Sequence, residues 1–217
     1  LFRFIYLYLA KIKFKIFSNK LKIAFFDLDH TVIDNDCDVS WKEYLFEQKI
    51  IVKESLKESR HFFSLYKQGE LPIKDFINFQ LKELKSKSLI EISKLVEMHF
   101  KTYVKPKIFK EAKNKIDYYQ KNKVPVVAIS ACNDIVLSPL IKYLNFNHKI
   151  VTTVEKKGGI FTGKILGEYV LKEQKYKMAK KLTKKLNIDL KNAVFYSDSI
   201  NDLPLLKSVG LPVVVNP

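Results

Sequence analysis

Residues 22–31 read Lys-Ile-Ala-Phe-Phe-Asp-Leu-Asp-His-Thr, and this stretch is the strongest local indication of the fold. Its run of apolar residues predicts a short strand that is covered on both faces. Two acids, Asp27 and Asp29, follow where the strand passes into a polar loop. In open α/β sheets, ligands bind beyond the carboxyl ends of the strands. The stretch therefore predicts a buried strand with a polar site at its end.

The rest of the chain alternates between apolar strand-like runs and segments with helical periodicity. Strands are expected at residues 22–28, 124–129, 149–153, 193–196 and 213–215, and a hairpin at 158–164. Helices are expected at about 106–122, from the end of the second strand to about 144, at 171–187 and at 201–208. This alternation favours an α/β fold with three Rossmann-like layers, in which helices cover both faces of a parallel sheet.

Residues 40–104 differ from the rest, because they have helical periodicity and no strong β-branched run. One break, at residues 69–72, contains Gly69 and Pro72. We read four or so helices here. The segment is therefore a helical insert after the first strand of the sheet.

The charge of the chain suggests a nucleic acid or an anionic membrane surface as a partner, but its distribution weakens that idea. The 217 residues include 39 Lys and Arg against 23 Asp and Glu, which gives a net charge of +16. The lysines at 180, 181, 184 and 185 alternate with apolar residues at helical spacing and are expected to face solvent. Arginine, the usual reader of phosphates and bases, occurs only at Arg3 and Arg60. We therefore expect no nucleic acid partner.

The N-terminal segment and the cysteines bear on location. Residues 1–20 contain an apolar run at 4–10 that is too short to span a bilayer, and they are expected to be an extension. No secretory cleavage pattern is visible. Cys37 and Cys132 are too few for a disulfide framework or a four-thiolate zinc site. A reducing, cytoplasmic setting without a membrane span is the simplest expectation.

Polar groups follow three of the predicted strands and form one set with a clear chemistry. Asp27, Asp29 and Asp198 can meet at the carboxyl edge of the sheet. Three carboxylates in one place require a cation, and oxygen ligands of this kind suit Mg²⁺. Ser130 and Lys175 would supply donors to phosphate oxygens. A carboxylate, ionised at neutral pH, can attack phosphorus directly once cations offset the repulsion between anions.

The chain resembles the haloacid dehalogenase superfamily, and within it subfamily IB, the phosphoserine-phosphatase-like branch. Asp27-Leu28-Asp29-His30-Thr31 fits the DxDxT motif, and Asp198-Ser199-Ile200-Asn201-Asp202 fits the DxxxD motif. Ser130 after an apolar strand fits the second motif, and Lys175 fits the third. One departure is Ser197, where the family usually has glycine; serine adopts most turns, so activity is still expected.

The resemblance implies a role for each of these residues. Asp27 would be the nucleophile that forms an aspartyl-phosphate, and Asp29 the general acid and then the general base. Mg²⁺ would be held by Asp27, the backbone carbonyl of Asp29, and Asp198. Thr31 and Asp202 would have supporting roles. The phosphate would be bound by Ser130, Lys175 and Asn201.

The resemblance also implies a domain division and a substrate class. Residues 21–38 and 105–217 would form the catalytic core, and residues 39–104 a helical cap that closes over a small phosphorylated metabolite. Arg60 in the cap could bind a substrate carboxylate, which favours phosphoserine. A histidinol-phosphate phosphatase is the alternative, since aromatic and acidic cap residues are also present. A phosphotransferase of the same fold and a non-catalytic basic binding protein remain as further alternatives.

Overall fold

A mostly parallel sheet of six strands is the centre of the computed structural model, which describes residues 20–215. The order of its strands is β4-β3-β2-β1-β5-β6. They are β1 (Ile23–Phe26), β2 (Val126–Asn133), β3 (His148–Lys157), β4 (Ile160–Leu166), β5 (Ala193–Ser197) and β6 (Leu211–Val214). Only β4 runs antiparallel to its neighbour, as the return strand of a hairpin with β3. The expected α/β fold is therefore confirmed.

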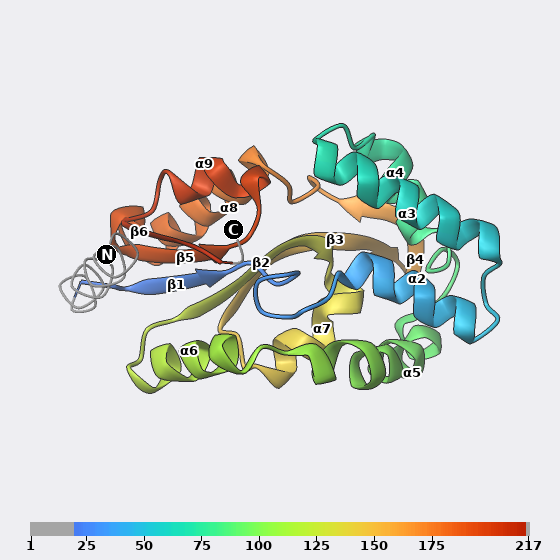
Figure 1. Cartoon of the computed structure of the whole chain (residues 1–217), viewed down its shortest axis with the longest axis horizontal. Helices are drawn as coiled ribbons and strands as arrows, with labels where there is room; N and C mark the ends of the chain where they lie inside the picture. Colours follow the sequence, from blue (N-terminus) through green and yellow to red (C-terminus); the bar gives the residue numbers. More distant parts are fainter. Residues whose placement is uncertain (1–19, 216–217) are drawn as a thin grey trace, which may run out of the picture.

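Helices cover both faces of the sheet (Figure 1). On one face lie α6 (Lys110–Lys121) and α7 (Asp134–Tyr143); on the other lie α8 (Glu173–Lys185) and α9 (Leu203–Leu206). The first strand shows why two cores form. Ala24 and Phe26 pack into one apolar cluster, while Ile23 and Phe25 pack into the other, because successive side chains point to opposite faces.

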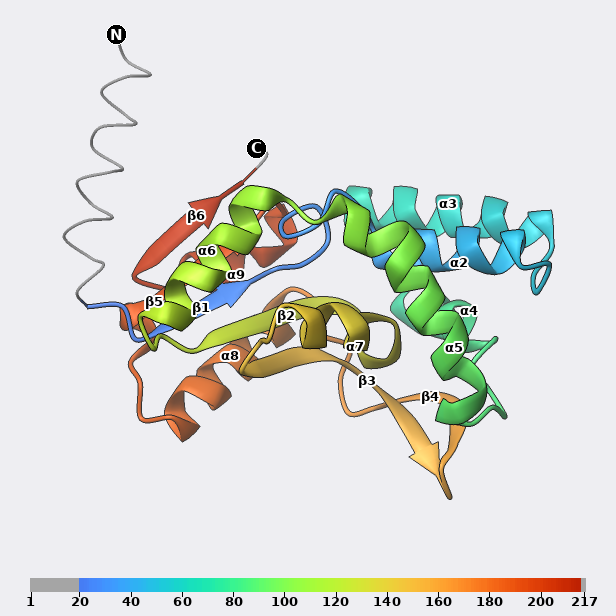
Figure 2. The same cartoon turned by 90° about the horizontal axis from the view of Figure 1, so that it is seen from below.

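The helical segment comprises α2 (Cys37–Glu47), α3 (Lys53–Gln68), α4 (Ile73–Leu81) and α5 (Leu89–His99). These helices form a group beyond the carboxyl end of β1 (Figure 2). The helix α2 begins where the side chain of Asp36 accepts a hydrogen bond from the backbone of Val39. The helix α3 ends at Gly69, which adopts the left-handed conformation with a φ of 77°.

Several boundaries differ from those predicted, among them the start of α6 and the end of β2. Pro106 lies in a short 3₁₀ turn, η2 (Lys105–Lys107), and α6 begins only at Lys110, because Ile108 and Phe109 are extended. The strand β2 continues beyond Ile129, where its end was expected, to Asn133. Within that added part its pairing with β3 is irregular between Ser130 and Asn133. This irregularity puts Ser130 near the carboxyl end of the regular pairing.

No helix within residues 20–215 is long and apolar enough to cross a membrane. The remaining helical elements are short: η1 (Phe100–Val104), a π-helical turn that continues α5, and two 3₁₀ turns, η3 (Leu190–Asn192) and η4 (Ile200–Asp202). The expected extension at residues 1–20 lies, except for Lys20, outside the described part of the chain.

Candidate active site

Three neighbouring strands bring the predicted site residues to one edge of the sheet. Phe26 of β1 is in register with Ala128 of β2 and with Tyr196 of β5. The next residue after Phe26 is Asp27, whose backbone donates a hydrogen bond of 2.9 Å to the Tyr196 carbonyl. Ser130 and Asp198 each lie two residues beyond their partners in this register. Together with Asp29 and Lys175, these side chains line one cavity.

Lys175 on α8 is the centre of the charge arrangement. Its ammonium donates hydrogen bonds of 2.7 Å to Asp27 Oδ1 and 2.9 Å to Asp202 Oδ2. The Lys175 side chain is 3% exposed and that of Asp202 is 0% exposed. Burial of this kind leaves each charge dependent on its partners. Lys175 is therefore a fixed cation beside the carboxylate of Asp27.

The pKa values of Asp27 and Lys175 depend on two opposing effects, burial and the neighbouring opposite charges. Burial raises the pKa of Asp27 well above its ordinary value, and the Lys175 ammonium opposes that shift. Burial lowers the pKa of Lys175, but the carboxylates of Asp202 and Asp27 outweigh it and raise this pKa above its ordinary value. Lys175 therefore stays protonated, and its charge favours the ionised form of Asp27.

Asp29 is held by the loop that leads into α2. Its Oδ1 accepts a hydrogen bond of 2.9 Å from the backbone of Cys37, and its Oδ2 accepts one of 3.2 Å from Ser130 Oγ. Burial raises the pKa of Asp29, and the hydrogen bond from Cys37 opposes the shift. A carboxyl group whose pKa is raised by burial can hold a proton closer to neutral pH than a free one. Asp29 therefore has the character of a general acid.

Thr31 joins the first loop to the loop after β5. Its Oγ1 donates a hydrogen bond of 3.1 Å to Asp198 Oδ1 and accepts one of 3.1 Å from the backbone of Asp198. Residue His30, between Asp29 and Thr31, has a positive φ of 55° and lines the cavity. The turn at His30 lets the two acids and the threonine leave one short loop in different directions. Thr31 therefore positions Asp198.

Asp202 and Ser197 form the support behind Lys175. Ser197 Oγ donates a hydrogen bond of 2.7 Å to Asp202 Oδ2 and accepts one of 3.1 Å from the backbone of Ser199. Serine at position 197 thus adds a contact that glycine could not make. The departure at this position is compatible with the site.

The cavity continues into the helical segment. Its lining there is mostly aromatic and polar: Ser59, Phe62, Phe63, Tyr66, Phe76 and Gln80, with Val39 as an aliphatic member. Asp36 and Asp38 at the start of α2 and Tyr169 after β4 complete it. Burial raises the pKa of the Tyr66 hydroxyl, and hydrogen bonds with Ser199 and Asn201 oppose this shift. Tyr66 on α3 therefore reaches the loop that carries Asp198.

Four sequence-predicted residues lie outside the cavity lining: Thr31, Arg60, Asn201 and Asp202. Arg60 is exposed, although its neighbours Ser59 and Phe62 line the cavity, so the structure gives no support to Arg60 as a substrate contact. Asn201 lies in η4 behind the lining and meets Tyr66. Thr31 and Asp202 also lie behind the lining, as expected for supporting residues.

Other lining residues were missed from the sequence. Asp36 and Asp38 belong to the acidic run at 34–38 that follows the DxDxT motif, and this run was a usable signal. Tyr66, Gln80 and Tyr169 come from three separate segments, and no local pattern marks them. Only the folded arrangement of α3, α4 and the loop after β4 brings them together.

The oxygen donors of the site suit a hard divalent cation. Asp27 and Asp198 line the same cavity, and Thr31 holds Asp198 in place. Within residues 20–215, no group of three or more His, Cys, Asp or Glu side chains could hold a metal ion by itself. Mg²⁺ does not need such a group, since it keeps several waters and is bound through one or two carboxylates plus phosphate. The donor set therefore fits Mg²⁺.

Comparisons with known proteins agree with the fold and identify the family. The model of the family described as haloacid dehalogenase-like hydrolase matches residues 24–207. A histidinol-phosphatase of Neisseria meningitidis is 30% identical over 200 residues, which are 90% of each chain. A structure of a protein of unknown function from Bordetella pertussis has a TM-score of 0.83 and 27% identity, with 91% of each chain covered. A structure of a substrate-bound phosphoserine phosphatase, 18% identical, shares the fold with a TM-score of 0.68 over 89% of this chain and 85% of its own.

Proposed function

Because the chain belongs to the haloacid dehalogenase-like hydrolase family, as a phosphatase-type hydrolase, we propose that it hydrolyses a small phosphorylated metabolite through an aspartyl-phosphate and requires Mg²⁺. The observation that carries the proposal is the contact of 2.7 Å between Lys175 and Asp27 in a cavity that Asp29, Ser130 and Asp198 also line. A nucleophile, an acid, a phosphate-binding hydroxyl and a fixed cation thus share one site.

In the first step, the carboxylate of Asp27 attacks phosphorus. Lys175 occupies Oδ1, which leaves Oδ2 as the attacking oxygen. The bond from Oδ2 to phosphorus forms while the bond from phosphorus to the leaving oxygen breaks. The leaving alkoxide takes a proton from Asp29, whose raised pKa keeps that proton available. The products are the free alcohol and an aspartyl-phosphate on Asp27.

In the second step, water attacks the phosphorus of the aspartyl-phosphate. Asp29, ionised by the first step, accepts a proton from that water, and the bond between phosphorus and Oδ2 of Asp27 breaks. Inorganic phosphate leaves, and both carboxyl groups return to their starting states. Ser130, which donates to Asp29 in this structure, would hold a phosphate oxygen together with Lys175.

Mg²⁺ would be held by Asp27, by Asp198 and by the backbone carbonyl of Asp29. When bound, it offsets the repulsion between the attacking carboxylate and the phosphate dianion. Thr31 would fix the orientation of Asp198 toward the ion through its two hydrogen bonds. Asp202 and Asn201 would support this side of the site from η4.

The same proposal divides the chain into a core, residues 21–38 and 105–217, and a cap, residues 39–104. Two contacts support a closing role for the cap. Tyr66 meets Ser199 and Asn201, and the Gly69 carbonyl at the end of α3 accepts a hydrogen bond of 3.3 Å from Lys172. A cap that meets the core around the reacting groups excludes water from the first step.

Two substrates come from the relatives' names, phosphoserine and histidinol phosphate. The sequence favours phosphoserine, because Arg60 could bind the carboxylate of this substrate. With Arg60 outside the cavity lining, that reason is lost. The choice between the two then depends on the lining of the cap side of the cavity.

The proposed function is tested by steady-state phosphatase assays with a generic aryl phosphate, with and without Mg²⁺. Wild type is expected to be active only with Mg²⁺. Asp27→Asn keeps the shape of the side chain and removes the nucleophile, so its activity is expected to fall by about 10³-fold or more. Asp34→Asn is the matched control, because Asp34 is exposed seven positions further along the same loop region. An Asp27→Asn enzyme with wild-type activity would refute the mechanism.

A further inference from the structure

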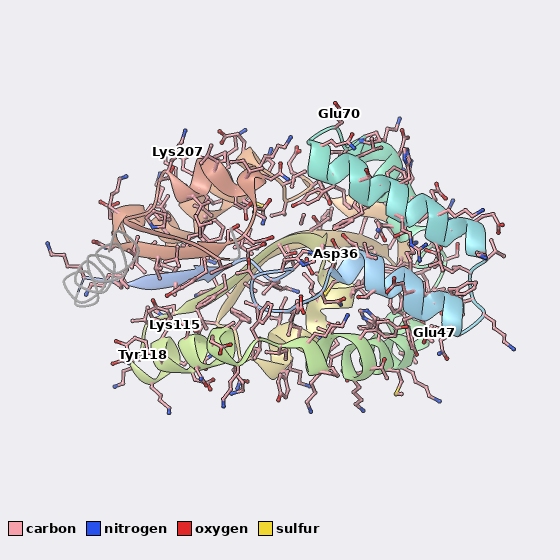
Figure 3. The ribbon with its side chains drawn as sticks, viewed as in Figure 1. Asp36, Glu47, Glu70, Lys115, Tyr118 and Lys207 are labelled. Carbon is pink, nitrogen blue, oxygen red and sulfur yellow. The ribbon has the colours of Figure 1, made fainter. Side chains whose placement is uncertain are left out.

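Several hydrogen-bond acceptors line the part of the cavity that faces the helical segment. Asp36 caps the N-terminus of α2, at the end of that helix nearer the sheet (Figure 3), and Asp38 lies in its first turn. Gln80 on α4 and Ser59 on α3 line the same cavity. These groups lie beyond the phosphate-binding residues, where the alcohol half of a phosphomonoester would have to lie.

Two of these polar groups are buried and have no partner within the described residues. Gln80 is 5% exposed and Ser59 is 3% exposed, and neither Gln80 Oε1 nor Ser59 Oγ makes a hydrogen bond there. Buried polar atoms in native proteins are nearly always satisfied, so such atoms in a cavity indicate a ligand that satisfies them. Gln80 Oε1 is an acceptor only, so the matching ligand group is a donor.

The charges of the cavity lining point the same way. Lys175 is the only lysine or arginine among the lining residues, and its ammonium is bound by Asp27 and Asp202. Against it stand five lining carboxyl groups, those of Asp27, Asp29, Asp36, Asp38 and Asp198. A bound phosphate and Mg²⁺ would balance one another near Asp27 and Asp198. No second lysine or arginine of the lining would remain for the carboxyl groups of Asp36 and Asp38.

Lys42 acts on Asp38 through its charge, but its hydrogen bonds go to other residues. Lys42, one turn further along α2, is fully buried and donates to Glu83 at 2.5 Å and to the Phe79 carbonyl at 2.8 Å. Asp38 Oδ1 itself accepts only a weak hydrogen bond of 3.3 Å from the Cys132 thiol. Burial, together with the neighbouring acids, raises the pKa of Asp36 to about 7 and that of Asp38 to about 8. His30 opposes the shift at Asp36 and Lys42 opposes the shift at Asp38, but burial and the neighbouring acids outweigh both. A cationic ligand would lower both pKa values.

Aromatic rings complete this end of the cavity. Phe62, Phe63, Tyr66, Phe76 and Tyr169 all contribute to its lining. Ring faces attract a protonated nitrogen, and more strongly when water is excluded. The three phenylalanine rings offer no hydrogen-bond donor to a carboxylate. Acceptors and aromatic rings together are the surroundings that protein sites provide for an organic cation.

We infer that the substrate is the phosphate ester of an alcohol that bears a protonated nitrogen and no carboxylate, with Asp38 and Gln80 as the specificity-determining residues. The inference rests on the proposed function, since the phosphate end of the ligand is placed by Asp27 and Lys175. A substrate with an α-carboxylate would put that group among carboxyl groups, with no lining arginine or lysine free to meet it.

The test compares esters that differ in charge at the alcohol end. Phosphoethanolamine and histidinol phosphate carry a cation without a carboxylate, phosphoserine adds a carboxylate, and glycerol phosphate carries neither. We expect kcat/KM for the better of the two cationic esters to exceed that for phosphoserine and for glycerol phosphate by about tenfold or more. Phosphoserine or glycerol phosphate hydrolysed as well as the better cationic ester would overturn the inference.

Two variants test whether Asp38 and Gln80 cause the preference for cationic esters. Asp38→Asn and Gln80→Leu are each expected to lower the ratio of kcat/KM for the cationic ester to kcat/KM for the aryl phosphate by about tenfold. Asp34→Asn is expected to leave that ratio unchanged. An unchanged ratio in both site variants would overturn the assignment. If wild type hydrolyses no ester with Mg²⁺, including the aryl phosphate, the proposed function fails; if it hydrolyses the aryl phosphate without preferring a cationic ester, the inference alone fails.

Discussion

Lys175 donates a hydrogen bond of 2.7 Å to Asp27 from a helix 148 positions further along the chain. The same ammonium holds Asp202, whose side chain is completely buried, at 2.9 Å. A single cation therefore stabilises two buried carboxylates and also faces the place where phosphate would bind. In the proposed mechanism, folding and catalysis would therefore both depend on this side chain.

Replacing Lys175 should damage stability and activity together. Lys175→Met leaves two buried carboxyl groups without a cation, which should lower the free energy of unfolding by about 3 kcal/mol. It also removes a fixed charge from the transition state, so kcat/KM should fall by about 10²-fold or more. Urea unfolding and steady-state kinetics measure the two effects.

The matched control is Lys177→Met, which removes an exposed lysine from the same helix. It should change the free energy of unfolding by less than about 0.5 kcal/mol. Equal stability of the two variants would show that the Lys175 contacts are not structurally important.

Ser197 should contribute measurable stability, because it donates to Asp202 at 2.7 Å inside the protein. Ser197→Ala should lower the free energy of unfolding by about 1 kcal/mol. Ser197→Gly, the residue usual in the family, should cost slightly more because glycine gains freedom in the unfolded chain. Thermal unfolding checks both variants against Ser93→Ala, an exposed serine. No difference among the three would argue against the Ser197 contact.

Stability should fall in mild acid because of His99, which lies completely buried between α2 and α5 beside Trp41 and Tyr44. Burial lowers the pKa of His99 from 6.5 to about 4. The unfolded chain therefore binds one more proton between these values, so this contribution to stability is complete above about pH 6.5 and is lost as the pH falls toward 4. The loss amounts to about 3 kcal/mol.

The His99 contribution is isolated by comparing wild type with His99→Gln in urea unfolding between pH 7.5 and pH 4.5. The stability difference between the two should shrink as the pH falls, because only wild type must protonate a buried ring. His61→Gln, which changes an exposed histidine, is the control and should parallel wild type. A constant difference between wild type and His99→Gln would contradict the prediction.

Substitution of Asp198, or of Thr31, which positions it, should change the Mg²⁺ dependence of the activity. Asp198→Asn should raise the Mg²⁺ concentration for half-maximal activity by about tenfold or more, since one of two carboxylates is lost. Thr31→Val removes both hydrogen bonds to Asp198 and should raise the same Mg²⁺ concentration by about tenfold. Titration of chelator-treated enzyme with Mg²⁺ measures both. Unchanged titrations would place the ion elsewhere.

Much of the fold could be predicted from the sequence, because its signals are local. The apolar run at 23–26 and the alternation of strands with helices were enough to predict a sheet covered on both faces. Boundaries were harder to predict where tertiary contacts decide them. The strand β2 runs through polar residues to Asn133 because β3 pairs with it there, and α6 starts late because Ile108 bridges to Ile33.

The candidate site also contains residues that could be predicted from the sequence and residues that could not. Asp27, Asp29, Ser130 and Asp198 could be predicted because each follows an apolar run of the sequence that forms a strand. The register of the strands brings them together. The residues on the cap side of the cavity could not be predicted. Tyr66, Gln80 and Tyr169 come from separate segments, and no local pattern encodes how these segments pack. Arg60 shows the reverse case: its chemistry is suitable, but the helix turns it toward solvent.

The identity of the nucleophile is tested most directly by trapping the phosphorylated enzyme. Wild type should be mixed with substrate and Mg²⁺, quenched in acid, digested and analysed by peptide mass spectrometry. The account predicts one phosphoryl group on the peptide that contains Asp27, and none on the same peptide of Asp27→Asn. This group should survive cold dilute acid and be removed by mild alkali. A phosphoryl group on a different residue of the active wild-type enzyme would contradict it.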